Sequence, residues 1–342
     1  MDYLAPTLYF LDILIILYLY LRFRSLSGLQ QSLRQIGTLA PIPILLANLL
    51  YSSNPIASIG WLIHLFLYFL FIFTFETTLL KIILPVSALL QILIASVQVF
   101  LGHSIGGLLY YVGERNVSVG SPGIALTTFM DKVVLRAYGT FSHPNILAGW
   151  LVVVFLILLS YKPSAKLKIL YSTLVAIGIV LTGSRSAAIS LFIFVVPIYL
   201  INNLKLRIIY FALVISPAIY FLSFGAPIRA DISISERTSL QLTSLKVIKT
   251  YPVFGTGANA SISTYPTISP TFRLLQPDHN SPTLLLSWFG FFGLIALIYV
   301  LPLSNLFVFI PLLPLLFLDH YIFTSPQGIF ILLLYLRVVK LK

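Results

Sequence analysis

Two arginines and one histidine stand at positions that suit chemistry on an anionic substrate. Arg185 lies in a short Gly-Ser-Arg connection between two apolar runs, where backbone N–H groups and a guanidinium together favour an anion. Arg237 lies in a long polar segment, and His279 closes that segment just before the next apolar run. Imidazole titrates near neutral pH, so His279 has the chemistry of a proton-transferring group. These residues predict a site that binds an anion and moves a proton.

Each of these positions also has a plainer structural interpretation. The Arg185 side chain could reach the lipid headgroups, and His279 could cap or pack against a helix. His143 and Asn145 flank Pro144, which suits the first turn of a helix, so both could act as caps. The residue types leave both interpretations open.

The histidines and one glycine-rich stretch give little support to a metal or a nucleotide cofactor. Four histidines are candidates for a shared metal site: His103, His143, His279 and His320. They lack metal-ligand spacing, and the chain has no cysteine. Residues 255–260 carry the letters of a dinucleotide-binding loop without a surrounding βαβ unit, so we interpret residues 251–257 as a turn. We expect neither a metal nor a cofactor.

The elements that must position these residues are membrane helices. Of the 342 residues, 59% are apolar and 9% are charged, whereas soluble domains contain about 25% charged residues. The mean hydropathy is +1.02. Basic cytoplasmic loops explain the formal charge of +12, so we expect contact with membrane lipids and no nucleic-acid partner. The composition excludes a soluble enzyme and a nucleic-acid-binding module.

About 11 apolar runs are long enough for membrane helices, each of which needs about 20 residues. They cover approximately residues 4–21, 37–51, 56–75, 79–100, 144–160, 166–182, 186–201, 206–224, 283–301, 305–318 and 327–339. Lys and Arg gather in alternate connections, which marks those connections as cytoplasmic. We therefore expect an all-α polytopic membrane helical bundle with its N-terminus outside and its C-terminus in the cytoplasm. This orientation places Arg185, Arg237 and His279 on the outer face.

Two outer segments are too long to be simple turns, at about residues 101–143 and 225–282. The second contains an amphipathic stretch from Ser235 to Lys249. Its expected apolar face consists of Leu240, Leu242, Leu245 and Ile248. We predict an N-terminal membrane region, residues 1–135, that includes the first long loop. A second membrane region, residues 136–342, includes the large extracytoplasmic loop 225–282.

Five motifs follow one another between residues 136 and 339. They are 139–149 (GTFSHPNILAG), 182–188 (TGSRSAA), Glu236-Arg237 with 251–257 (YPVFGTG), His279-Asn280, and Asp319-His320-Tyr321 with Gln327. In this order the motifs resemble those of the O-antigen ligase and O-antigen polymerase superfamily of bacterial membrane glycosyltransferases. The resemblance implies a fold of the GT-C type in the bacterial cytoplasmic (inner) membrane.

The reaction implied by the resemblance is transfer of a glycan from a polyprenyl-pyrophosphate donor to a hydroxyl acceptor, on a lipid or a growing polysaccharide. Arg185 and Arg237 would act on the pyrophosphate and His279 on the acceptor, with inversion at the anomeric carbon and no required metal. The resemblance further implies a set of substrate-binding residues: Arg136, His143, Asn145, Asn280, Asp319 and His320.

One acidic residue of the family pattern is missing from its usual place. The family often carries a glutamate near the first glycine after the His-Asn pair, and residues 287–290 contain no acid. Its role is therefore either absent or taken by Asp278 or Asp319. An assembly protein without activity remains an alternative for this reason.

A transporter or flippase for a lipid-linked or anionic substrate is the main alternative function. Such a protein needs charged or broken helices at mid-bilayer in both halves, and only Asp12 and a few prolines approach this pattern. Ligase and polymerase use the same donor chemistry and differ in the acceptor, so the sequence does not separate them.

Overall fold

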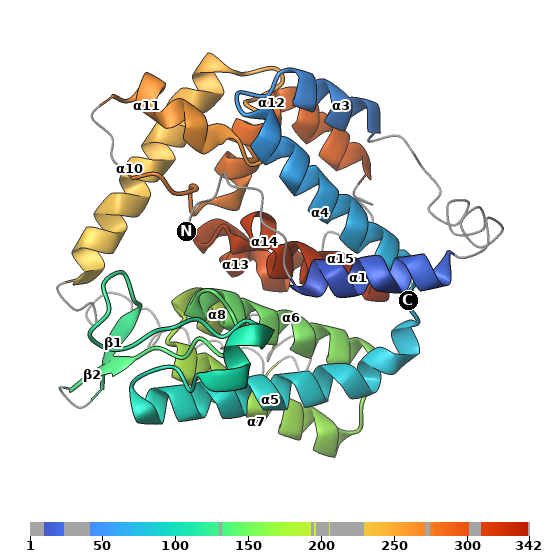
Figure 1. The fold of residues 1–342 in the computed structure, drawn as a ribbon, viewed down its shortest axis with the longest axis vertical. Helices are drawn as coiled ribbons and strands as arrows, with labels where there is room; N and C mark the ends of the chain where they lie inside the picture. Colours follow the sequence, from blue (N-terminus) through green and yellow to red (C-terminus); the bar gives the residue numbers. More distant parts are fainter. Residues whose placement is uncertain are drawn as a thin grey trace. The chain divides into compact units, whose positions relative to one another are not determined.

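The protein is mostly helical, with 73% helix and 4% strand, as the apolar runs predict. The computed structural model describes residues 10–23, 42–129, 132–192, 195, 205, 229–270, 274–300 and 309–340 (Figure 1). Within these ranges, three helices are long and apolar enough to cross a membrane: Pro55–Thr74, Thr77–Leu101 and Ala165–Thr182. Shorter apolar helices cover Pro144–Ser160, Phe309–Leu318 and Pro326–Val339. The count of about 11 membrane helices stays a prediction, because the expected spans 186–201 and 206–224 lie mostly outside the described residues.

The chain forms two compact units. Unit 1 comprises Met1–Phe75, Tyr220–Phe309 and Leu316–Leu333, and unit 2 comprises Glu76–Ile219, Ile310–Leu315 and Leu334–Lys342. The predicted division of the chain into the membrane regions 1–135 and 136–342 stays a prediction.

Unit 1 contains helices from both ends of the chain. Its elements are α1 (Phe10–Arg22), α3 (Ile42–Leu50), α4 (Pro55–Thr74), α10 (Arg229–Thr250), η4 (Ser261–Thr264), α11 (Tyr265–Ile268), α12 (Ser281–Val300) and α14 (Tyr321–Thr324). The remaining C-terminal helices are α13 (Leu313–Leu318) and α15 (Pro326–Lys340). Helix α4 begins in the way its sequence predicts, because Asn54 caps it through Ala57 N and Pro55 occupies its first turn.

The core of unit 1 holds one charged side chain between α1 and α4. Asp12 is fully buried there, and it accepts hydrogen bonds from the Tyr68 hydroxyl at 2.6 Å and from His64 Nε2 at 3.1 Å. Tyr68 also belongs to an apolar cluster that contains Trp61 and Trp288, whose rings meet edge to face. A buried carboxylate is costly without partners, so this polar contact explains how α1 tolerates Asp12.

The turn predicted at residues 251–257 is confirmed, and it lies against a kink in α12. Gly290 has a φ of +63° inside α12, and its neighbours exchange backbone hydrogen bonds with the turn. A Cβ at Gly255 would lie 2.4 Å from the Trp288 carbonyl oxygen, and one at Gly290 would lie 2.3 Å from that of Val253. Gly255 of the YPVFGTG motif and Gly290 of α12 are thus needed for close backbone approach.

Helix α10 confirms the amphipathic stretch of the long outer segment, but its buried face differs from the predicted one. Leu240 and Ile248 are buried as expected, whereas Leu242 and Leu245 are exposed. Thr243, Ser244 and Val247 complete the buried face. Residues 240, 243, 244, 247 and 248 have the spacing of one helical stripe, and the leucine positions 242 and 245 do not belong to it.

Unit 2 is built around a helix that is buried almost throughout. Its elements are η1 (Thr77–Leu79), α5 (Leu80–Leu101), η2 (Gly107–Val112), β1 (Leu126–Phe129), β2 (Lys132–Leu135), α6 (Pro144–Ser160), α7 (Ala165–Thr182) and α8 (Arg185–Ile189). Helix α6 is buried from Pro144 to Leu159 and packs against α5 and α7 (Figure 1). A helix that is apolar on all sides belongs in such a central position.

The first of the two long segments, at about residues 101–143, is ordered in the part that the structure describes. It contains η2 and an antiparallel hairpin, in which Leu126 pairs with Leu135 and Phe129 with Lys132. Val117, Leu135 and Tyr138 form a small apolar core beneath the hairpin. The segment therefore brings its last residues, from Arg136 onward, to the start of α6.

Candidate functional site

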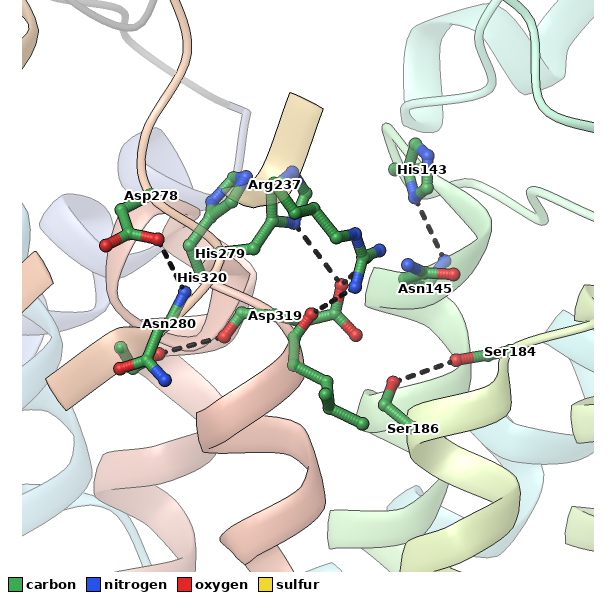
Figure 2. A network of polar contacts seen from close by, with 12 residues as sticks. His143, Asn145, Ser184, Ser186, Arg237, Asp278, His279, Asn280, Asp319 and His320 are labelled. Carbon is green, nitrogen blue, oxygen red and sulfur yellow. Dashed lines mark hydrogen bonds and ion pairs between the residues drawn. The ribbon is translucent and has the colours of Figure 1, made fainter. Parts of the chain in front are cut away.

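Three charged side chains converge in unit 1, and each comes from a different part of the chain. Arg237 projects from α10, His279 lies in the loop before α12, and Asp319 lies in the connection between α13 and α14. Figure 2 draws the contacts that join the arginine and the histidine to the carboxylate. The fold of unit 1 thus brings the motifs Glu236-Arg237 and His279-Asn280 to the motif that contains Asp319.

The two ion-pair contacts of the Asp319 carboxylate are longer than hydrogen bonds. Its Oδ1 lies 4.0 Å from Arg237 Nη2 and 3.9 Å from His279 Nδ1. The Asp319 side chain is 4% exposed, whereas those of Arg237 and His279 are 36% and 22% exposed. Arg237 is aimed by a hydrogen bond from its Nη1 to the Leu318 carbonyl oxygen at 2.9 Å. The cluster therefore consists of one buried carboxylate and two partly exposed basic side chains.

The His279 ring is oriented by its neighbours, and its Nδ1 has no hydrogen-bond partner although that atom is buried. The ring packs edge to face against His320, with 4.8 Å between the ring centroids. His320 itself is held by a contact of 2.6 Å between its Nδ1 and Thr324 Oγ1. A buried imidazole nitrogen without a partner is unusual, and here it faces the Asp319 carboxylate.

The residues on either side of His279 fix the loop in which it lies. Asn280 caps α12, since its Oδ1 accepts from Thr283 N at 3.1 Å. Asp278 is buried and accepts from Asn280 N at 3.0 Å and from the Thr283 hydroxyl. Burial raises the pKa of Asp278 above its ordinary value, and the hydrogen bonds from Thr283 and Asn280 lower it in part. This framework holds the backbone of His279.

Two residues next to this cluster were not among the predicted site residues. Tyr321 is buried beside Asp319, and its hydroxyl has no hydrogen-bond partner. Burial, together with the Asp319 charge, raises the pKa of that hydroxyl well above its ordinary value, so it stays protonated. Thr283 could have been found from the sequence, because Asn-Ser-Pro-Thr is a helix-start signal. Tyr321 stands in the Asp319-His320-Tyr321 motif, although the motif does not reveal that its hydroxyl is buried.

Unit 2 carries the other predicted site residues, and most of them make structural contacts. Arg136 donates from Nε to the Thr182 carbonyl oxygen at 2.6 Å and from Nη2 to Asn145 Oδ1 at 2.5 Å. His143 caps α6 by accepting from Asn145 N at 3.1 Å (Figure 2). His143 therefore makes the helix-capping contact that the structural interpretation of this residue predicts. Substrate binding by these residues stays a prediction.

Arg185 lies in the tight turn predicted between two apolar helices. Helix α7 ends at Thr182, Gly183 adopts the left-handed conformation at φ +60°, and Arg185 opens the short helix α8. The Arg185 side chain is exposed, and Ser184 and Ser186 beside it are buried and joined by a 3.2 Å contact of their hydroxyls. Since Arg185 belongs to unit 2, its presence in one site with Arg237 and His279 stays a prediction.

In the described part of the chain, no group of three or more His, Cys, Asp or Glu side chains is placed to hold a metal ion. The cluster in unit 1 instead offers a guanidinium, an imidazole and a carboxylate. Such a set suits the binding of an anionic group and the transfer of a proton.

These features define a helical membrane protein with a basic, partly buried polar cluster near the ends of its helices. The family model described as O-antigen ligase matches residues 170–298 of the chain. The resemblance predicted from the motifs is thereby confirmed, and it supports glycosyltransferase activity in general. The match contains Arg185, Arg237, His279 and Asn280, whereas residues 136–145 and 319–320 lie outside it. No curated protein and no solved structure matches the chain.

Proposed function

We propose that the protein transfers a glycan from a polyprenyl-pyrophosphate donor to a hydroxyl acceptor, as an O-antigen ligase or polymerase. The acceptor is a lipid or a growing polysaccharide, and the reaction takes place on the outer face of the bacterial cytoplasmic membrane. The family match over residues 170–298 supports the class of reaction. The observation that carries the site is the convergence of Arg237 and His279 on the buried carboxylate of Asp319.

Asp319 orients the imidazole in this proposal. When Nδ1–H of His279 points at the Asp319 carboxylate, the other ring nitrogen, Nε2, carries the lone pair and acts as the base. The 3.9 Å separation is too long for a hydrogen bond without substrate, and such contacts commonly tighten when substrate binds. Asp319 would then supply the acid that the stretch 287–290 lacks.

The transfer itself is a single displacement at the anomeric carbon. The acceptor oxygen bonds to that carbon as the bond from the carbon to the pyrophosphate oxygen breaks, and the electron pair leaves with the pyrophosphate. The acceptor proton passes to Nε2 of His279. Attack from the face opposite the leaving group inverts the configuration, and the guanidinium of Arg237 stabilises the departing negative charge.

Arg185 is the second pyrophosphate-binding residue in this proposal, and its exposed guanidinium is available for that role. One group of predicted substrate-binding residues lies at the N-terminal end of α6 and consists of Arg136, His143 and Asn145. The other group lies around His279 and consists of Asn280, Asp319 and His320. We propose that both groups contact the substrates, directly or by fixing the residues that do. Guanidinium groups take the part that a metal ion plays in many phosphoryl-binding sites, so no metal is required.

The transporter or flippase remains the alternative, and Asp12 was its main support in the sequence. The contacts of Asp12 with Tyr68 and His64 give this carboxylate a structural explanation within unit 1. Reconstitution in liposomes separates the two functions. Covalent transfer of the glycan without passage across the vesicle membrane supports the enzyme, and uptake of the donor without transfer supports the carrier.

Replacement of His279 tests the proposed reaction. In a host strain whose own copy of the gene is deleted, His279→Ala should abolish glycan transfer, because the acceptor proton loses its base. His103→Ala is the matched control, since His103 is an exposed histidine of the first outer segment and should keep full transfer. Membrane levels of both variants are measured by immunoblot. Full transfer by His279→Ala at a normal protein level would show that the site is assigned wrongly.

A further inference from the structure

A cluster of exposed apolar side chains follows the outer end of α5. We define the η2 lobe as residues 105–112, and its exposed members are Ile105, Leu108, Tyr110, Tyr111 and Val112. Leu108 is 83% exposed and Tyr111 is 80% exposed. Burial of apolar surface away from water is favourable, so a contiguous group of exposed apolar side chains marks a surface that is normally covered.

The surface of α5 indicates what covers the lobe. Large side chains that are exposed recur along one stripe of α5: Ile82, Val86, Leu89, Leu90, Leu93, Val97 and Phe100. The opposite stripe, which includes Leu84, Ala88, Ile92 and Ala95, is buried. In a membrane-spanning helix the exposed apolar stripe faces lipid. The stripe ends at Phe100, which is 90% exposed, and the exposed apolar side chains of the η2 lobe follow a few residues later in the sequence.

We propose that the η2 lobe lies in the outer leaflet of the membrane, as an interfacial anchor beside the end of α5. Its composition suits that depth, because tyrosines concentrate where the apolar part of the bilayer meets the headgroups. The exposed Arg115 follows directly, and its positive charge complements anionic lipid headgroups. The η2 lobe is thus a short segment, rich in aromatic and aliphatic side chains, that lies at the membrane interface without crossing the membrane.

A buried carboxylate fixes the lobe to α5. Glu114 Oε1 accepts from Gln98 Nε2 at 2.8 Å and from Ile105 N at 2.7 Å, and its Oε2 accepts from Gly106 N at 2.7 Å. These bonds tie both ends of the lobe to the last turns of α5. The polar backbone groups at the base are satisfied internally, so the apolar side chains are presented outward in a fixed position.

Site-directed spin labelling tests this placement, and the absence of cysteine gives a chain without background labelling. Val112→Cys carries the label in the lobe, and Val133→Cys in β2 is the matched control. Both are valines of the first outer segment, and both are 55% exposed. In vesicles of phosphatidylethanolamine and phosphatidylglycerol, the label at 112 should collide with oxygen more than with a water-soluble nickel complex. The label at 133 should show the reverse preference.

Two results would overturn the proposal. One is a label at 112 that is as accessible to the nickel complex as the label at 133. The other is spin–spin broadening at 112 that disappears on dilution with unlabelled protein, since it would show that a second copy covers the lobe. Glu114→Gln places an amide donor in the carboxylate site and should shift the label at 112 toward the aqueous pattern. Lipid contact of the lobe does not depend on the transfer reaction, so either proposal can fail alone.

Discussion

The two arginines Arg136 and Arg237 lie in different units and are used in different ways. Two donor nitrogens of Arg136 are engaged at 2.5–2.6 Å: Nη2 with Asn145, and Nε with the carbonyl of Thr182 at the end of α7. Arg237 has one hydrogen bond, to Leu318 O at 2.9 Å, while its Nη2 stands 4.0 Å from the Asp319 carboxylate. An arginine with short hydrogen bonds to other protein groups stabilises the fold. An arginine with only a long ionic contact on one nitrogen has N–H groups that can bind a ligand.

The same contrast separates the two predicted histidines. His143 is occupied as the cap of α6, whereas Nδ1 of His279 is buried without a hydrogen bond and faces a carboxylate. An unsatisfied buried polar atom costs about 1–3 kcal/mol, which a structural site would avoid. This difference supports the proposal that the unit 1 cluster binds a substrate, and replacement of the two arginines tests the same contrast.

Of the two arginines, Arg237 should have the larger effect on transfer when it is replaced. Arg237→Ala removes the guanidinium that we propose stabilises the leaving pyrophosphate, and loss of one such donor lowers kcat by about 10²–10³-fold. The melting temperature should fall less than that of Arg136→Ala, because Arg237 contributes one hydrogen bond and one long ion pair, at 4.0 Å. Arg237→Lys keeps the charge and loses the forked geometry, so its rate should fall between those of Arg237→Ala and the natural protein. The measurement is glycan transfer by the purified chain in proteoliposomes.

The lysine variant is the more informative of the two. A wild-type rate in Arg237→Lys would mean that bidentate binding of phosphate oxygens is not required. A normal rate in Arg237→Ala would remove Arg237 from the site altogether.

Arg136→Ala should have a moderate effect, and it should appear in stability. Loss of the contacts with Asn145 and Thr182 leaves their acceptors without this donor and lowers the free energy of unfolding by about 1–3 kcal/mol. The cation also lies at the C-terminal end of α7, where the helix dipole favours it. Thermal unfolding in detergent measures the change. A variant with normal stability and abolished transfer would reverse the comparison with Arg237, and would make Arg136 a direct substrate ligand.

Much of the local structure could be predicted from the sequence, since it depends on neighbouring residues. The start of α6 at Pro144, the turn at Gly183 and the turn at 251–257 all follow from the conformational limits of proline and glycine. The prediction of the buried face of α10 was partly wrong, because it gave more weight to the hydrophobicity of each residue than to its position around the helix. Thr243 and Ser244 lie on the buried stripe, and Leu242 and Leu245 lie off it.

The candidate site was predictable as a set of residue types and less so as an arrangement. His279 and Asp319 are 40 positions apart, and the sequence named Asp319 as a substrate-binding residue and as one of two replacements for the missing acid, without placing it beside His279. Tertiary packing of the α13–α14 connection against the loop before α12 makes the choice, through contacts such as Ser281 Oγ to the Asp319 carbonyl oxygen at 2.8 Å. The orphaned hydroxyl of Tyr321 depends on burial, which sequence periodicity does not reveal at a short helix such as α14.

The smallest expected effect concerns Asp278, the acid that the structure uses to hold the loop of His279. Burial raises its pKa above the ordinary value of 3.8, so the folded chain binds this proton more tightly than the unfolded chain. The resulting stabilisation is complete below pH 3.8 and is lost as the pH rises through the raised pKa of the folded state. Asp278→Asn has no proton to lose at this position.

The melting temperature of Asp278→Asn relative to the natural protein should therefore rise between about pH 4 and pH 7, when both are measured in the same detergent. Thr283→Val sharpens the test, because removal of the hydroxyl that donates to Asp278 raises its pKa further and moves the loss of stability to higher pH. A difference between Asp278→Asn and the natural protein that stays constant with pH would mean that Asp278 does not titrate in this way. The carboxylate would then act on the His279 loop through its hydrogen bonds alone, as Arg136 acts at the start of α6.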